Sequence, residues 1–274
     1  MNFKQKRDSF RMLTAVSLAA LALSSTSAFA QEAAAGIQYD DDAIVVIGIT
    51  KQDANIQDTP IAITAFSGEK LEAQGITKVD EIATFTPGFN IRGAGNNPTA
   101  LTLSMRGQIQ NDNIATLEPS VGTYLDELYI ARAYGLNVEL VDVESVQVLK
   151  GPQGTLFGRN TSAGAVLIQT ANPRYDEFSG KVSATYGRFN ERTGQVMLNL
   201  GLNDKFAIRG ALFYQKRDGY KTDVDTGRKY EGRETWNGRV KVGWKPTETL
   251  EVILSGEWYD TFIDGPARQN LFFN

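Results

Sequence analysis

The chain has 274 residues, of which 42% are hydrophobic and 22% charged, so one large or two modest folded domains are expected. It contains no cysteine and no histidine. This excludes disulfides, thiolate chemistry, a Ser–His–Asp triad and imidazole zinc sites. The formal net charge of −4 gives no indication of nucleic-acid binding. We therefore expect no catalytic residue, no metal site and no cofactor, and we do not expect an enzyme.

Residues 1–30 have the pattern of a secretory signal peptide. A basic start precedes an apolar run over residues 12–23, and small residues ending in Ala28-Phe29-Ala30 follow it. The run is shorter than the about 20 residues that a membrane-spanning helix needs. We expect export with cleavage before Gln31, followed by a flexible leader over residues 31–58.

Residues 59–175 mix short strands and short helices, which predicts a compact α+β domain of ordinary size. Ser67 is placed to cap a helix that ends at Gly75, and Thr77 offers a second cap. Runs typical of strands cover residues 61–66, 101–106, 121–130, 143–149 and 165–170.

From Gly180 onward apolar and polar residues alternate in a series of separate runs. Leu198 and Leu200 flank Asn199, for example, and Val240 and Val242 flank Lys241. The pattern predicts five strands of about ten residues, each with one apolar face, which is the length a tilted strand needs to cross a bilayer. A soluble sandwich would also alternate.

The connections between these strands favour the membrane. Tight turns are expected at Asn203-Asp204 and at residues 246–248, whereas residues 216–234 form a long charged loop. Short turns on one side and long loops on the other are typical of outer-membrane barrels, as are tryptophans near strand ends. Residues 176–274 are thus predicted to be the first strands of an incomplete antiparallel transmembrane β-barrel. The tryptophans are Trp236, Trp244 and Trp258.

A glycine-rich segment over residues 150–160 invites comparison with a phosphate-binding loop. No Gly-Lys-Ser/Thr closes it, so the comparison fails. Its glycines, Gly151, Gly154 and Gly158, are better explained by positive φ angles or close packing.

Taken in order, the motifs resemble those of the TonB-dependent outer-membrane receptors, of the siderophore-receptor kind, over their N-terminal portion. The similar segments are residues 57–64, Thr86-Pro87-Gly88 with Ile91-Arg92-Gly93, Met105-Arg106-Gly107, residues 118–126, 143–152 and 158–165. The resemblance implies an α+β plug domain followed by barrel strands. The family commonly has glycine after the aspartate of its Tyr/Val-Asp strand, whereas Glu127 follows Asp126 here.

The resemblance also assigns a TonB box to Ile44, Val45, Val46 and Ile47. The outer membrane has no ATP, so energy must arrive mechanically from the inner membrane. An extended segment can pair with the periplasmic protein TonB by strand addition. An ordinary plug strand is the alternative for this segment.

Further residues receive structural or ligand roles from the resemblance alone. Arg92 and Arg106 are expected to form ion pairs within the plug or with the barrel. The other expected structural residues of the plug are Gly107, Gly151, Pro152, Gly154, Gly158, Arg159 and Asn160. Apical loops are expected to face the ligand through Asn96, Asn97, Gln108 and Asn111.

The implied function is TonB-dependent import of a scarce large ligand across the outer membrane. A ferric siderophore is the leading ligand class, and cobalamin and oligosaccharides are alternatives. The expected partners are TonB, outer-membrane lipid and the small-molecule ligand, with no nucleic acid. Leader and plug are expected to face the periplasm. Family barrels have about 22 strands. Five strands cannot close, so an N-terminal fragment without transport activity is the alternative expectation.

Overall fold

The computed structural model describes residues 45–46, 54–55, 62–94, 97–110 and 117–265. The predicted signal peptide, most of the leader and the candidate residues Ile44, Ile47, Asn96 and Asn111 lie outside these ranges. The chain divides into two compact units, Met1–Asp41 and Asp42–Asn274, and every described residue belongs to the second. Within the described ranges, no helix is long and apolar enough to cross a membrane.

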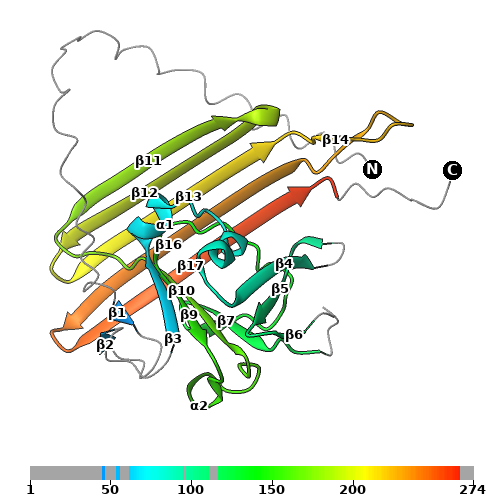
Figure 1. Cartoon of the computed structure of the whole chain (residues 1–274). Helices are drawn as coiled ribbons and strands as arrows, with labels where there is room; N and C mark the ends of the chain where they lie inside the picture. Colours follow the sequence, from blue (N-terminus) through cyan, green and yellow to red (C-terminus); the bar gives the residue numbers. More distant parts are fainter. Residues whose placement is uncertain (1–44, 47–53, 56–61, 95–96, 111–116, 266–274) are drawn as a thin grey trace, which may run out of the picture. The chain divides into compact units, whose positions relative to one another are not determined.

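The first part of the described chain is an α+β unit of short strands and helices (Figure 1). Its mixed sheet has the order β3-β9-β10-β7-β8, in which only the β10–β7 pair is parallel. A second sheet has the order β4-β5-β6. The bounds are β3 Ala62–Ser67, α1 Gly68–Ala73, the 3-10 helix η4 Val79–Phe85, β4 Phe89–Ala94, β5 Asn97–Met105, β6 Gln108–Ile109, β7 Val121–Leu125, β8 Leu128–Tyr129, β9 Val143–Lys150, α2 Gly154–Phe157 and β10 Gly164–Thr170.

Helix α1 begins and ends as its sequence predicts. The Ser67 hydroxyl accepts a hydrogen bond from the backbone N–H of Lys70 at 3.2 Å, which satisfies a donor that the first turn cannot pair internally. Gly75, at φ +68°, follows the last turn. The prediction at Thr77 was wrong. The 3-10 helix begins at Val79, and the Glu81 carboxylate accepts from the backbone N–H groups of Thr77 and Lys78 at 2.6 and 3.1 Å.

The single strand predicted over residues 121–130 was also wrong. The chain turns at Asp126 and Glu127, with φ angles of +46° and +67°, so that β7 and β8 form a hairpin. Two consecutive left-handed residues are the geometry of a tight two-residue hairpin turn, which usually contains glycine. The turn escaped prediction because neither residue is glycine.

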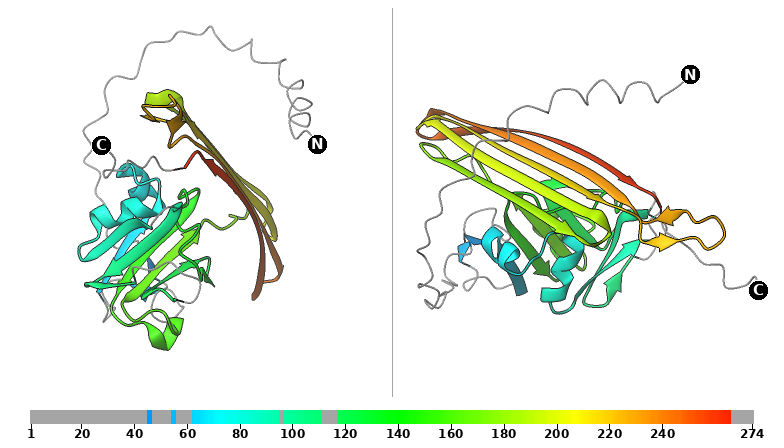
Figure 2. Two further views of the ribbon diagram at one scale, coloured as in Figure 1. Left: turned by 90° about the vertical axis from the view of Figure 1, so that its right-hand side faces the viewer. Right: turned by 90° about the horizontal axis from the view of Figure 1, so that it is seen from above.

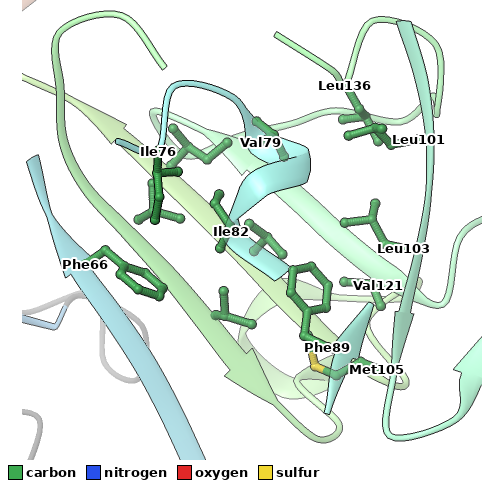
Figure 3. Packing of buried hydrophobic residues seen from close by; sticks show 14 of the residues in the cluster. Phe66, Ile76, Val79, Ile82, Phe89, Leu101, Leu103, Met105, Val121 and Leu136 are labelled. Atoms are coloured by element: carbon green, nitrogen blue, oxygen red, sulfur yellow. The ribbon is translucent and has the colours of Figure 1, made fainter. Parts of the chain in front are cut away.

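The core of the α+β unit lies between its mixed sheet and the elements η4, β4 and β5. Figure 3 shows Ile82 and Phe89 pointing at residues of the sheet and of β5, among them Val121 and Leu103. Ile82, Met105 and Val121 are fully buried. At about 25 cal/mol per Å² of buried apolar surface, such a cluster is the main stabilising contribution to this unit.

Five long strands form the second part of the described chain, side by side in one curved layer (Figures 1 and 2). The sheet is antiparallel throughout, in the order β11-β12-β13-β16-β17. The bounds are β11 Phe178–Gly187, β12 Glu191–Asn203, β13 Phe206–Arg217, β16 Arg233–Thr247 and β17 Leu250–Ile263. Four of the five are longer than the ten residues predicted, because each continues past its alternating run. These sheets confirm the predicted fold class, an α+β unit followed by antiparallel strands that do not close into a barrel.

The two faces of the long sheet differ as the alternation predicts. On β13 and β16 the odd-numbered residues Ala207, Arg209, Asn237 and Lys241 are buried, and we call this side the covered face. The opposite side exposes large apolar residues: Phe178, Val182, Val240, Leu254 and Trp258 are each more than half exposed. A contiguous apolar face of this size is expected where strands meet lipid.

Aromatic residues border this apolar face. Trp236 pairs in register with Tyr214, and their ring centroids are 4.4 Å apart, toward the end of the strands that carries the long connection. Trp244 lies opposite Phe206 toward the other end. Trp258 pairs with Gly238, one outward-facing row farther inside than Trp236. The tryptophans thus lie near strand ends as predicted, Trp258 somewhat less so.

The connections partly follow the predicted asymmetry. Tight turns join β12 to β13 and β16 to β17 at one end. At the other end the predicted long loop is shorter than expected, since β13 and β16 continue into it, and it carries a small hairpin, β14 Lys221–Thr222 with β15 Lys229–Tyr230. At that same end only Arg188–Asn190, the 3-10 helix η5, joins β11 to β12.

Candidate functional site

The α+β unit contacts the covered face of the long sheet through buried carboxylates. Asp142 accepts two hydrogen bonds from Arg209, 2.8 Å from Nε and 2.7 Å from Nη2. Both side chains are less than 10% exposed. A planar guanidinium and a carboxylate match in this bidentate geometry, which is the strongest form of ion pair that side chains make.

A second carboxylate, that of Glu139, is the most deeply buried of those at this interface. Its side chain is 2% exposed and lies 3.3 Å from Nη1 of Arg233 and 3.9 Å from Nζ of Lys78. The Tyr259 hydroxyl donates to it at 3.4 Å. One carboxylate thus faces two cations, and burial, followed by the charge of Arg233, lowers the pKa of Lys78 below its usual value.

The third contact forms around Lys241 on β16. Its ammonium lies 3.2 Å from Asp126 and donates to the Thr170 carbonyl and to the Asn172 side chain, both at 3.0 Å. Asp126 also accepts from the backbone N–H of Thr170 at 2.8 Å and from its hydroxyl at 2.6 Å. Asp126 therefore joins the β7–β8 turn, the end of β10 and the long sheet.

Arg239 completes this row of contacts. It donates to the Val141 carbonyl at 2.9 Å and to Glu257, a neighbour within the sheet, at 3.0 Å. The apolar contact between the α+β unit and the long sheet is small. It consists of one buried cluster of Val141, Ala211 and Phe213. The interface is therefore mainly polar, unlike the core of the α+β unit.

The connection between the two parts is held by Asn199 of β12. Its fully buried side chain accepts from the backbone N–H of Arg174 at 2.8 Å and donates to the carbonyls of Arg174 and Glu177 at 2.9 and 2.8 Å. Gly201 leaves room for this segment, because a Cβ atom there would lie 2.4 Å from the backbone nitrogen of Glu177. The connection thus passes close against the sheet.

The candidate TonB box lies apart from this interface in the chain. Val45 and Val46 form the two-residue strand β1, which pairs antiparallel with Ala54–Asn55 as β2. The pairing shows that this backbone adopts an extended conformation with hydrogen bonds to another strand. It leaves the predicted pairing with TonB untested.

The residues of the glycine-rich segment surround the β9–β10 connection. Gly151 and Gly158 have φ angles of +113° and +76°, whereas Gly154 begins α2. Arg159 forms an exposed ion pair with Glu118 at 2.8 Å, and Asn160 donates to the Tyr129 hydroxyl at 3.0 Å. These contacts hold a loop in place and bring no reactive groups together. Pro152 of this segment is exposed, two residues after the end of β9.

The two motif arginines are not members of the buried interface. Arg92 and Arg106 are exposed, on β4 and directly after β5. The guanidinium of Arg106 lies beside Gly151, where an added Cβ would be 3.1 Å away. Burial, followed by the charge of Arg106, lowers the pKa of Lys150 below its usual value. Arg106 at φ +52° and Gly107 at φ +79° form the β5–β6 turn. Gln108, a predicted ligand-facing residue, is exposed at the start of β6, and Asn97 begins β5.

Sequence reasoning missed Asp126, Glu139 and Asp142 as the residues that contact the sheet. One signal was available for their partners. Arg209, Arg239 and Lys241 occupy positions on the polar face of otherwise amphipathic strands, which indicates cations directed at a buried partner. In the part of the chain that the structure describes, no group of three or more acidic side chains could hold a metal ion.

Comparison with known proteins shows what this chain is similar to. Residues 55–165 match the family described as the TonB-dependent Receptor Plug Domain. The pesticin receptor of Yersinia pestis is 30% identical over 136 residues, which are 50% of this chain and 20% of that protein. The ferrioxamine receptor of Yersinia enterocolitica is 23% identical over 252 residues, 82% of this chain and 33% of that protein.

Solved structures extend the likeness into the long sheet. The crystal structure of the ferric yersiniabactin uptake receptor of Yersinia pestis superposes with a TM-score of 0.66 at 26% identity, covering 73% of this chain and 32% of that one. The match therefore includes strands beyond the plug. The chain spans about a fifth to a third of the length of these relatives.

Proposed function

We propose that the chain is part of a TonB-dependent receptor, whose plug domain it matches over residues 55–165, and that it takes part in energised import of a ferric siderophore. The family consists of outer-membrane receptors rather than enzymes, and its plug faces the periplasm. The α+β unit is hereafter called the plug, and the long sheet the wall.

The observation that carries the proposal is the polar character of the plug–wall interface. Bidentate Asp142–Arg209 and the buried Glu139–Arg233 pair join two parts whose described residues share one buried apolar cluster of three residues. Separating an apolar interface would expose surface at about 25 cal/mol per Å². Separated ionic groups regain hydration instead, so a plug held this way can leave the wall without unfolding its own core.

TonB supplies the work in this proposal by pairing with residues 44–47. Val45 and Val46 already accept a partner strand within the chain. A two-residue pairing is short, and an incoming strand of TonB can replace it by main-chain hydrogen bonding. Residues 1–30 serve as the signal peptide and residues 31–58 as the leader that reaches into the periplasm.

The ligand class follows from the matched receptors. The ferrioxamine and ferric yersiniabactin receptors are named for iron chelates. We assign ligand contacts to the apical loops, including Asn96, Asn97, Gln108 and Asn111. Cobalamin and oligosaccharides are the alternative cargoes that the test must include.

The test is uptake by an iron-starved strain that carries the complete receptor gene. Val45→Pro with Val46→Pro removes two backbone donors from the box. We expect uptake of radioactive iron complexed to ferrioxamine or yersiniabactin to fall to the level of a strain lacking TonB. Cobalamin and maltooligosaccharide are tested in parallel. Uptake of either one instead of both iron chelates would overturn the ligand assignment.

The matched controls separate TonB pairing from the pairing inside the chain. Val45→Thr with Val46→Thr keeps the backbone donors and the β-branched shape, and should retain uptake. Asn55→Pro disrupts β2 and leaves the box intact. Equal loss of uptake in Asn55→Pro and in the double proline variant would indicate that residues 44–47 act through their pairing with β2, as an ordinary plug strand.

A further inference from the structure

Two pairs of like charges lie directly opposite each other on the covered face of the wall. Arg209 of β13 pairs in register with Lys241 of β16, and Arg217 pairs with Arg233 farther along the same strands. Like charges in directly opposed positions destabilise an antiparallel pair. Each pair therefore needs compensation from outside these two strands.

The plug supplies that compensation. Asp142 binds Arg209, Asp126 lies 3.2 Å from Lys241, and Glu139 lies 3.3 Å from Arg233. Three carboxylates of the plug thus compensate the charges of three cations of the wall. When the plug leaves the wall, the carboxylates leave with it and the cations remain.

The remaining cations lie along one face of two neighbouring strands, in two groups: Arg217 with Arg233, and Arg209 with Arg239 and Lys241. On the covered face of β13 from Phe206 to Arg217, and of β16 from Arg233 to Lys241, every charged residue is positive. From Arg233 to Lys241 these cations extend about 26 Å along β16, at about 3.3 Å per residue. Glu257 on β17 and Glu191 on β12 are carboxylates beside them, bound to Arg239 and Gln215. We call these cations the basic ladder; its members are Arg209, Arg217, Arg233, Arg239 and Lys241.

We propose that the basic ladder is a binding surface for anionic solutes, covered by the plug in the closed state and presented to the lumen when the plug is displaced. The inference rests on the proposed function, since import requires the plug to move. The fitting solutes carry several carboxylates or similar anionic oxygens, which arginine binds through paired N–H donors. A row of such sites would favour transit of anions along the wall over transit of cations.

The test measures ion selectivity of the complete receptor in a planar bilayer. Urea on the periplasmic side displaces the plug, and the reversal potential is read in a potassium chloride gradient. We expect the opened receptor to prefer chloride over potassium by at least about threefold, as a lumen lined by one sign of charge should. Citrate, a tricarboxylate probe, should reduce the chloride conductance, and more strongly at low salt.

The test variant neutralises two ladder cations together with their plug partners. It carries Arg209→Gln, Asp142→Asn, Lys241→Gln and Asp126→Asn, so that no buried charge is left alone in the closed state. Asparagine also suits Asp126 and Asp142, whose φ angles are +46° and +50°. Chloride preference and citrate block should both decrease.

The control is Lys216→Gln with Glu234→Gln, an ion pair at 2.9 Å on the opposite face of the same two strands. It should keep the selectivity of the unmodified receptor. An opened pore without chloride preference, or an equal preference in the four-site variant, would overturn the basic ladder while leaving siderophore import standing. Absence of any urea-induced conductance, together with absent iron uptake, would overturn the import proposal as well.

Discussion

The guanidinium of Arg209 and the carboxylate of Asp142 meet in a bidentate pair, 67 residues apart in the chain, and neither side chain is more than 9% exposed. One residue belongs to the wall and the other to the plug. The side-chain hydrogen bonds from Arg209 to Asp142 are therefore both an electrostatic contact and one of the points where the plug and the wall are joined.

Neutralising Asp142 should loosen the plug. Asp142→Asn keeps a residue that tolerates φ +50° but leaves the buried Arg209 without its counter-charge. Breaking one partner of a buried ion pair costs about 3–5 kcal/mol. We expect the urea midpoint for plug release, followed by proteolysis, to fall accordingly.

Two controls check this assignment. Glu118→Gln removes the carboxylate of an ion pair in which the Arg159 side chain is 84% exposed, and it should change stability by less than about 1 kcal/mol. Adding Arg209→Gln to Asp142→Asn should recover much of the lost stability. Equal effects of Asp142→Asn and Glu118→Gln would contradict the role of burial.

Glycine at position 127 should stabilise the plug. Glu127 has φ +67°, which costs a side-chain-bearing residue about 1–2 kcal/mol, and glycine is free of that cost. Glycine has the larger conformational entropy in the unfolded chain, which offsets part of this gain. The free energy of unfolding of Glu127→Gly, measured by thermal unfolding, should therefore rise by about 1 kcal/mol. The matched control is Glu69→Gly inside helix α1, where the same substitution should lose about 1 kcal/mol. Destabilisation by both would refute the argument from the turn.

A methyl group at position 201 should displace the connection between plug and wall. The added Cβ of Gly201→Ala would lie 2.4 and 2.5 Å from the backbone nitrogens of Glu177 and Asp176. Forcing that segment away should cost about 1–3 kcal/mol and expose it to protease. Gly194→Ala, on the same strand, meets nothing within 4 Å and should leave the cleavage rate unchanged. Faster cleavage in both variants would point to a general weakening of β12.

The β14–β15 hairpin should lose order in acid. Hydrogen bonds from Lys221, at 2.5 Å, and from Tyr220 lower the pKa of Glu231 below its ordinary 4.5. Because the folded state favours the carboxylate, its contribution to stability is present above pH 4.5 and is lost as the pH falls through the lower folded pKa. Hydrogen exchange over residues 219–232 should accelerate in that range. Glu231→Gln should show fast exchange throughout, without the acid transition.

Much of the wall could be predicted, because burial on one side imposes a period of two on the residues themselves. Leu198, Asn199 and Leu200 alternate in the sequence as they do on the sheet. Strand ends were less predictable: β13 continues past its alternating run, where Lys216 forms an ion pair with Glu234 of β16 that no local pattern specifies.

The plug–wall contacts could not be predicted, for a different reason. Asp126, Glu139 and Asp142 lie in turns and loops, where a carboxylate is usually a solvated residue. Their partners are far along the chain, as with Glu139 and Arg233, which are 94 residues apart. The carboxylates and their cationic partners come together when the plug packs against the wall. The hairpin at Asp126-Glu127 was missed because it uses left-handed residues without glycine.

The position of β3 at the margin of the plug sheet has a mechanical consequence. Among the described strands β3 pairs with β9 alone, and six residues, Ala62–Ser67, form this ladder. A load that enters from the N-terminal side must be carried by that one ladder before it reaches any other strand. Tension along the strand axis stretches all its bonds together, whereas tension across the axis breaks them one after another. The β3–β9 ladder is therefore the part of the plug sheet that would separate first under load, and the direction of the pull determines the force that this separation needs.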